Sequence, residues 1–192
     1  MDITSIDKEI LMFIQTNIRC NFLTPIMKAI TYLGNSGLIW IVITLLLLMF
    51  KKTRKIGILS AIALIEELLI CNVFLKQLIK RMRPYDRYSD LTRIIAKQPD
   101  YSFPSGHSAA SFASAMVIFK NGDKKMGIPA LALAILISAS RLYVGVHYPS
   151  DVIGGIIIGM VCSYLAEFTL KGIQKLFNKK TEDKEVSKEG EE

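Results

Sequence analysis

Long apolar runs, separated by short charged clusters, dominate the pattern of this chain. Six apolar segments can be marked, at about residues 10–33, 36–50, 56–75, 105–119, 126–140 and 152–170. None alternates with the two-residue period of a β-strand, so the pattern predicts helices. Nearly every segment is apolar on all sides, which is typical of membrane helices and not of a soluble bundle. We therefore predict an all-α fold, a polytopic membrane helix bundle with about six transmembrane helices.

The first segment, 10–33, is the least regular of the six. Arg19, Pro25 and Lys28 interrupt it, so a tilted or broken span and an interfacial helix both remain open. Several other segments contain only about 15 residues, or about 22 Å of helix, against about 30 Å for a hydrocarbon core. Flanking polar residues would have to complete these spans, or the bilayer would thin locally.

Composition agrees with a membrane protein and restricts the other classes. The 192 residues are 51% hydrophobic and carry a net charge of +7, which excludes a disordered or collagen-like chain. We predict a membrane-embedded domain over residues 1–177 and a polar, disordered cytoplasmic tail over 178–192. The acidic N-terminus argues against a cleaved signal peptide. The cysteines are too widely spaced for a redox or metal site; they are Cys20, Cys71 and Cys162.

Charged clusters predict how the bundle is oriented. Basic residues at 51–55, 120–125 and 171–180 fall on one side of alternating spans, which the positive-inside rule makes the cytoplasm. The loop of residues 76–103 would then lie outside, although it holds seven basic and three acidic residues. Either the orientation is wrong or these cations serve a purpose. Because the basic residues sit between apolar blocks, they suggest lipid headgroups or a phosphorylated substrate and not nucleic acid.

The predicted outer side collects residues suited to binding phosphate. Lys76, Arg83 and Arg141 supply fixed positive charge, and the two guanidinium groups match the geometry of a phosphate. Ser105 is a good N-cap and Gly106 allows close approach of the backbone, so the start of the fourth segment is a candidate anion site. Each of these residues taken alone could equally be a structural anchor or cap.

Both histidines of the chain also fall on this side. His147 and Asp151 are four residues apart, so a helical backbone would place them on one face, although Pro149 could instead begin the helix after His147. A carboxylate on one ring nitrogen fixes the tautomer and leaves the other free to attack. His147 is therefore a candidate nucleophile toward phosphorus, and His107 a candidate acid for the leaving oxygen.

Three motifs together resemble the type-2 phosphatidic acid phosphatase family. They read Lys-x6-Arg-Pro at 76–84, Pro-Ser-Gly-His at 104–107 and Ser-Arg-x5-His-x3-Asp at 140–151. The resemblance covers segments three to six and implies a six-helix membrane core and a phosphatase that uses no metal or other cofactor. It implies that His147 forms a phosphohistidine, Asp151 orients it and His107 protonates the leaving group. The implied phosphate-binding residues are Lys76, Arg83, Ser105, Gly106 and Arg141.

The resemblance also suggests the substrate and the location. It implies a multi-pass cell-membrane enzyme that removes the terminal phosphate of a lipid phosphate or diphosphate at the outer face. Undecaprenyl diphosphate is favoured, with phosphatidylglycerophosphate or phosphatidic acid as alternatives. The surrounding cations could attract a polyanionic headgroup; they are Lys80, Arg81, Arg87 and Arg93. A non-catalytic phospholipid binder or transporter is the alternative of another class, while the related vanadium haloperoxidases are soluble. The oligomeric state is not indicated.

A few further residues stand out within the apolar segments. Glu66 and Glu67 are adjacent inside the third segment, where carboxyl groups are costly, and we interpret them as buried against polar neighbours in preference to forming a proton relay. Asn72, one turn before the first motif, is interpreted as its support. Gly155 and Gly159 offer a small-residue surface for close helix packing.

Overall fold

The computed structural model describes residues 3–189 of the chain. Within that range every regular element is helical and there is no strand, which confirms the predicted all-α class. The α-helices are α1 (Ile3–Phe13), α2 (Leu23–Leu33), α3 (Leu38–Met49), α4 (Arg54–Glu67), α5 (Lys76–Ile79), α6 (Pro84–Arg87), α7 (Gly106–Asn121), α8 (Lys124–Tyr143) and α9 (Pro149–Glu189). Two π-helical segments, η1 (Ile14–Ile18) and η3 (Leu68–Leu75), and the 3₁₀ turn η2 (Asn35–Gly37) complete them.

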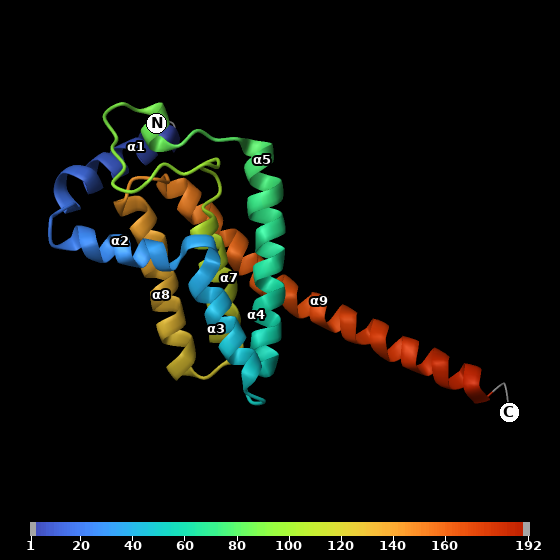
Figure 1. Cartoon of the computed structure of the whole chain (residues 1–192). Coiled ribbons are helices and arrows are strands. Elements are labelled where there is room, and N and C mark those ends of the chain that lie inside the picture. Colours follow the sequence, from blue (N-terminus) through green and yellow to red (C-terminus); the bar gives the residue numbers. More distant parts are fainter. Residues whose placement is uncertain (1–2, 190–192) are drawn as a thin grey trace.

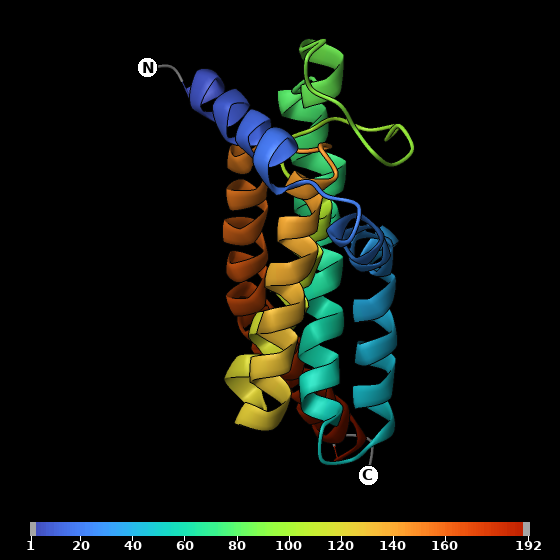
Figure 2. The same ribbon diagram turned by 90° about the vertical axis from the view of Figure 1, so that its left-hand side faces the viewer.

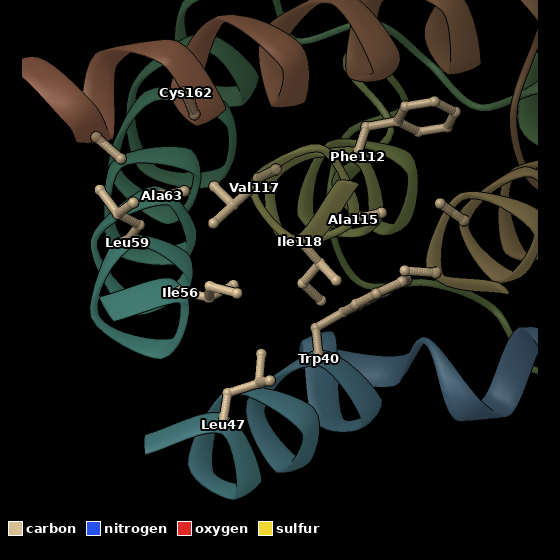
Figure 3. Packing of buried hydrophobic residues seen from close by; sticks show 14 of the residues in the cluster. Trp40, Leu47, Ile56, Leu59, Ala63, Phe112, Ala115, Val117, Ile118 and Cys162 are labelled. Carbon is tan, nitrogen blue, oxygen red and sulfur yellow. The ribbon is translucent and has the colours of Figure 1, made fainter. Parts of the chain in front are cut away.

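Helix α7 forms the centre of the bundle (Figure 1). It packs against α4, α8 and α9, and α3 packs on the outside of α4. Side chains of these five helices meet in one apolar core, with Trp40 of α3 and Val117 of α7 fully buried (Figure 3). The glycines of α9 allow the closest approach, because a Cβ added at Gly155 would lie 2.4 Å from the Ser105 carbonyl oxygen. This contact confirms that the small-residue surface of α9 is a packing surface.

Three described helices are long and apolar enough to cross a membrane: Arg54–Arg87, Lys124–Tyr143 and Pro149–Leu176. A fourth span is obtained if α2 and α3, which are bent by 50° at their junction, are counted as one broken span. The central helix α7 has 16 residues, ten of them buried inside the bundle. The bundle is thus that of a membrane protein, while the number six stays a prediction.

The irregular first segment does not form one continuous helix. Residues 10–33 are divided among the end of α1, η1 and α2, with an extended backbone at Arg19. Arg19 donates from Nε to the Tyr143 carbonyl oxygen at 2.8 Å, which ties the break to the end of α8. Two residues with positive φ, Ser36 at 51° and Gly37 at 67°, then turn the chain from α2 into α3.

The two ends of the bundle have different contents (Figures 1 and 2). Helix α1, the loop of residues 88–105 and the turn of residues 144–148 gather at one end, while the α3–α4 and α7–α8 connections lie at the other. Helix α9 runs obliquely across the bundle, passes α4 and extends away from it, and it remains helical to Glu189 (Figure 1). The helix thus continues through residues 178–189, and the disorder of the tail stays a prediction; residues 190–192 lie outside the described range.

Candidate active site

The three motifs meet at one cavity of about 770 Å³. The predicted residues that line it are Lys76, Arg83, Gly106, His107, Arg141 and His147. The other two, Ser105 and Asp151, are fully buried next to it, and the Ser105 N–H donates to the Asp151 carbonyl oxygen at 3.0 Å. The fold thus brings together eight residues that span 76 positions of sequence, from Lys76 to Asp151.

His147 lies in the tight turn between α8 and α9 and is 1% exposed. Its Nε2 is 3.4 Å from Arg83 Nη1 and its Nδ1 is 3.6 Å from Asp151 Oδ2. A guanidinium can only donate, so this contact leaves the lone pair on Nε2 and the proton on Nδ1, toward the carboxylate. Burial, and then the positive charges of Arg83 and Arg141, lower the pKa of His147 well below its usual range. The imidazole is therefore neutral, and its Nδ1 lies near the Asp151 carboxylate without a hydrogen bond to any described residue.

Asp151 is held by donors from three directions. Its Oδ2 accepts from Ser102 Oγ at 2.5 Å and from the Tyr148 N–H at 2.9 Å, while its Oδ1 accepts from Arg81 Nη1 at 2.5 Å. Helix α9 begins at Pro149, so His147 precedes the helix and the carboxylate reaches back from the first turn. The two residues lie close without sharing one helical face.

The two cations of the first motif share a carboxylate. Lys76 Nζ pairs with Asp100 Oδ2, and Arg83 Nη2 lies 2.5 Å from Asp100 Oδ1. Burial alone would raise the pKa of Asp100, but Lys76 and Arg83 outweigh it and lower that pKa to about 2. Arg83 also donates from Nη1 to the Val146 carbonyl oxygen at 2.7 Å, next to His147. The two oxygens of the Asp100 carboxylate thus lie between these two cations, in an arrangement that two oxygens of a phosphate could also adopt.

Arg141 is the most deeply buried of the cations, with 1% of its surface exposed. Its Nη1 donates to Thr31 Oγ1 of α2 at 2.8 Å, and its Nη2 donates to Gln98 Oε1 of the outer loop at 3.3 Å. No described residue accepts a hydrogen bond from its Nε. Two neutral partners therefore fix the guanidinium and leave its full charge for a ligand.

The start of α7 forms the opposite wall of the cavity. Ser105 is its N-cap and accepts a hydrogen bond from the Ser108 N–H, as predicted from the residue type. A Cβ at Gly106 would lie 2.6 Å from Asn72 Oδ1, so the glycine permits the close approach of η3. His107 Nε2 is 3.1 Å from Asn35 Oδ1, and because an amide oxygen only accepts, that nitrogen carries the proton.

The other singled-out residues have separate partners. Thr169 Oγ1 of α9 donates to Glu66 Oε1 at 2.6 Å, and Asn72 Nδ2 donates to Glu67 Oε1 at 3.0 Å. Both carboxyl groups thus meet polar neighbours, as interpreted, and Glu67 and Asn72 line the cavity next to Lys76. Within residues 3–189, no three His, Cys, Asp or Glu side chains are grouped to hold a metal ion.

Several residues at the site escaped prediction from the sequence. They are Asp7, Thr31, Asn35, Gln98 and Asp100, with Arg81 taken only as a headgroup-attracting cation. Arg81 instead bonds Asp7 and Asp151. The only sequence signal for Arg81 and Asp100 was the high density of charge in the outer loop. No feature of the sequence pointed to Asp7, Thr31 or Asn35 as residues of the site.

Comparison with known proteins places the chain in a family. The model of the PAP2 superfamily matches residues 54–171. Undecaprenyl-diphosphatase of Sulfolobus acidocaldarius is 38% identical over 128 residues, which cover 67% of this chain and 62% of the archaeal protein. This chain therefore spans less than two thirds of that relative's length.

Two solved structures share the fold over most of the chain. The crystal structure of the transmembrane PAP2-type phosphatidylglycerolphosphate phosphatase of Bacillus subtilis has a TM-score of 0.71 at 30% identity, covering 89% of this chain and 87% of that one. The crystal structure of LpxE from Aquifex aeolicus has a TM-score of 0.73 at 27% identity, covering 82% of this chain and 92% of that one. Both similarities cover a larger share of the chain than the family match to residues 54–171.

Proposed function

The chain belongs to the PAP2 superfamily, and on that premise we propose that it is an integral membrane phosphatase that hydrolyses a phosphorylated lipid. One observation carries the proposal: a single cavity joins the two histidines and three cations of the motifs to an apolar wall. A soluble phosphate ester would need only the histidines and the cations. A phosphorylated lipid needs these groups and also an apolar surface for its hydrocarbon chain.

The apolar wall is formed by α3, by α4 and by η3, which continues directly from α4. Ile41 and Leu45 of α3, Ile65 of α4 and Leu68 of η3 all line the cavity, and each of these side chains is exposed. In a membrane these side chains face acyl chains. A lipid whose phosphate lies between Lys76 and His147 would therefore rest its hydrocarbon chain against them.

In the first step, the lone pair of His147 Nε2 attacks phosphorus and the bond from phosphorus to the lipid-side oxygen breaks. His107 gives a proton to that oxygen, so the lipid product leaves neutral at this position. Burial and then the charge of Arg141 lower the pKa of His107 in the ligand-free site, and the negative charge of a bound phosphate would raise that pKa and favour the protonated form. Asp151, on the Nδ1 side at 3.6 Å, stabilises the positive charge that the ring gains. Lys76, Arg83 and Arg141 hold the remaining phosphoryl oxygens, with Ser105 and Gly106 at the helix terminus.

In the second step, a water molecule attacks the phosphohistidine. His107, now neutral, accepts a proton from this water, the P–N bond breaks and its electron pair returns to Nε2. Inorganic phosphate leaves, and His107 carries the proton needed for the next cycle. The protein groups supply positioning and electrostatic stabilisation, which are the main contributions in phosphoryl transfer.

For the substrate we propose undecaprenyl diphosphate, with phosphatidylglycerophosphate or phosphatidic acid as alternatives. Support comes from the name of the Sulfolobus relative, at 38% identity. Further support comes from the bundle itself, because α5 and the turn between α8 and α9, which carry Lys76 and His147, lie at the end opposite the α3–α4 and α7–α8 connections (Figure 1). The clusters at 51–55 and 120–125 would face the cytoplasm. The cavity would then open at the outer face, and α9 would end in the cytoplasm.

The proposed chemistry is tested by His147→Ala in purified, detergent-solubilised protein. We expect phosphate release from all three lipids to fall by about 10³-fold or more, because the nucleophile is lost. Lys125→Ala, in the cluster at the opposite end of the bundle, is the matched control and should retain activity. Full activity of His147→Ala would contradict the mechanism.

A trapped intermediate separates the enzyme from a non-catalytic binder. Acid-sensitive label from a ³²P-labelled lipid phosphate should appear on the wild-type protein in a rapidly quenched reaction and be absent from His147→Ala. A binder would retain the lipid without any covalent label. Ranking the release rates for the three lipids would then identify the preferred substrate.

A further inference from the structure

The N-terminal helix α1 carries a buried acid that no motif includes. Asp7 is 3% exposed, although α1 lies at the edge of the bundle and outside the family match to residues 54–171. A buried carboxylate is costly unless it is paired. Asp7 Oδ2 accepts from Arg81 Nη2 at 2.6 Å and from Ser150 Oγ at 2.5 Å, and Asp7 Oδ1 accepts from the Ser150 N–H at 2.9 Å.

Arg81 continues this chain of contacts to the proposed active site. Its Nη1 donates to Asp151 Oδ1 at 2.5 Å and to Ser150 Oγ at 2.7 Å, while its guanidinium lies 4.0 Å above the Tyr148 ring. Both ends of the guanidinium are therefore occupied by carboxylates, one from α1 and one from α9. Neither Asp7 nor Arg81 belongs to the described lining of the cavity.

The geometry points to a positioning role, and this inference rests on the proposed function. We propose that Asp7 and Arg81 position the His147–Asp151 pair from behind. Arg81 fixes Oδ1 of Asp151, so that Oδ2 stays on the side of the His147 ring. Asp7 fixes Arg81 and the first turn of α9 through Ser150. Helix α1 would thus support catalysis through Asp7, although none of its residues contacts the substrate.

Helix α1 also has contacts with the outer loop that do not involve Asp7, which makes the role testable. Lys8 Nζ pairs with Asp90 Oδ2 at 2.7 Å, in a partly exposed ion pair. Gln15, just after α1, donates from Nε2 to the Asp90 carbonyl oxygen at 2.9 Å and accepts from the Thr92 N–H at 2.8 Å. These contacts should hold α1 in place when Asp7 is altered, and Asp90 supplies a matched control.

The first experiment compares Asp7→Asn with Asp90→Asn. Each substitution neutralises one carboxylate that joins α1 to the rest of the chain, but only Asp7 is connected to Asp151. We expect Asp7→Asn to lower kcat for phosphate release by about 10- to 100-fold, because small misplacements of catalytic groups have effects of this size. KM should stay within about twofold, since the phosphate-binding cations are untouched. Asp90→Asn should keep wild-type kcat, and Asp7→Glu should recover part of the loss.

The second readout does not depend on turnover. The chain has only two histidines, so ¹⁵N-histidine labelling in detergent micelles gives two imidazole spin systems, and His107→Gln assigns them. Asp7→Asn should shift the Nδ1 resonance of His147 and leave that of His107 in place. Asp90→Asn should move neither.

The outcomes separate the inference from the proposed function. Unchanged kcat and unchanged His147 resonances in Asp7→Asn would overturn the inference while leaving the phosphatase intact. Equal losses of kcat and of thermal stability in Asp7→Asn and Asp90→Asn would overturn it as well, because they would show only a structural role for α1. A wild-type protein inactive on every lipid phosphate would refute the proposed function, and the imidazole resonances would still decide the positioning role.

Discussion

Arg141 allows a quantitative test of the proposed phosphate site, through Arg141→Lys. The substitution keeps the positive charge but removes the planar fork of donors. In the structure, one end of the fork is fixed by Thr31 Oγ1 at 2.8 Å and the other by Gln98 Oε1 at 3.3 Å. A lysine ammonium cannot satisfy both partners and also reach a phosphoryl oxygen in the same geometry.

The size of the effect follows from the hydrogen bonds lost. A hydrogen bond to a charged group contributes about 1.5–3 kcal/mol, so losing one to the phosphoryl group should lower kcat/KM by about 13- to 160-fold. Thr31→Val keeps the arginine and the volume of the side chain but removes one neutral partner. That loss, about 0.5–1.5 kcal/mol, predicts a smaller decrease of about 2- to 13-fold.

The assay measures inorganic phosphate released from a lipid phosphate in detergent, together with the unfolding temperature of each variant. Arg54→Lys is the matched control, because Arg54 is exposed at the other end of the bundle and donates from Nε to the Leu48 carbonyl oxygen. It should keep wild-type kcat/KM. An Arg141→Lys enzyme within twofold of wild type would remove Arg141 from the phosphate site, and a larger effect of Thr31→Val would refute the stated order.

Two further predictions concern the bundle and the outer loop. A Cβ at Gly159 would lie 2.3 Å from the Ala109 carbonyl oxygen, so Gly159→Ala should destabilise the fold by about 1–3 kcal/mol. Gly172→Ala is the control and should not destabilise the fold, because a Cβ there would meet no atom within 4 Å. Equal unfolding temperatures for the two variants would contradict this prediction. The lowered pKa of Asp100, about 2 against about 3.9 in an unfolded chain, means that its pairing stabilises the fold above about pH 4 and loses that effect as the pH falls toward 2. Asp100→Asn should therefore unfold at a lower temperature than wild type at neutral pH, and the difference in unfolding temperature should narrow below pH 4. A difference that does not change with pH would show that the ion pairs of Asp100 are not its cause.

The sequence predicted most where the chemistry is local in the chain. Ser105 could be assigned as an N-cap because capping depends on a few neighbouring residues, and the structure places its hydroxyl on the Ser108 N–H. The apolar segments could be assigned as helices for the same reason. The grouping of Lys76, His107 and His147 around one cavity followed from alternating spans, which bring every second connection to the same end.

Contacts between distant residues could not be predicted. Asp7 and Arg81 are 74 positions apart and Thr31 and Arg141 are 110 apart, and no local pattern pairs them. The path of residues 10–33 was open for the same reason, because the break at Arg19 is fixed by the carbonyl of Tyr143. The charge of the outer loop was recognised, but the ion pairs of Asp100 with Lys76 and Arg83 depend on how that loop folds back.

The exposed apolar side chains that border the cavity affect how the proposed activity should be measured. These exposed side chains are Ile41, Leu45, Ile65 and Leu68, and all four line the cavity. A substrate that enters past them arrives by two-dimensional diffusion within the bilayer or micelle. Its effective concentration is then its mole fraction among the surrounding amphiphiles, and not its molarity in the bulk solution. Adding detergent at constant total lipid should therefore slow the enzyme by surface dilution, and KM values have meaning only when expressed per amphiphile.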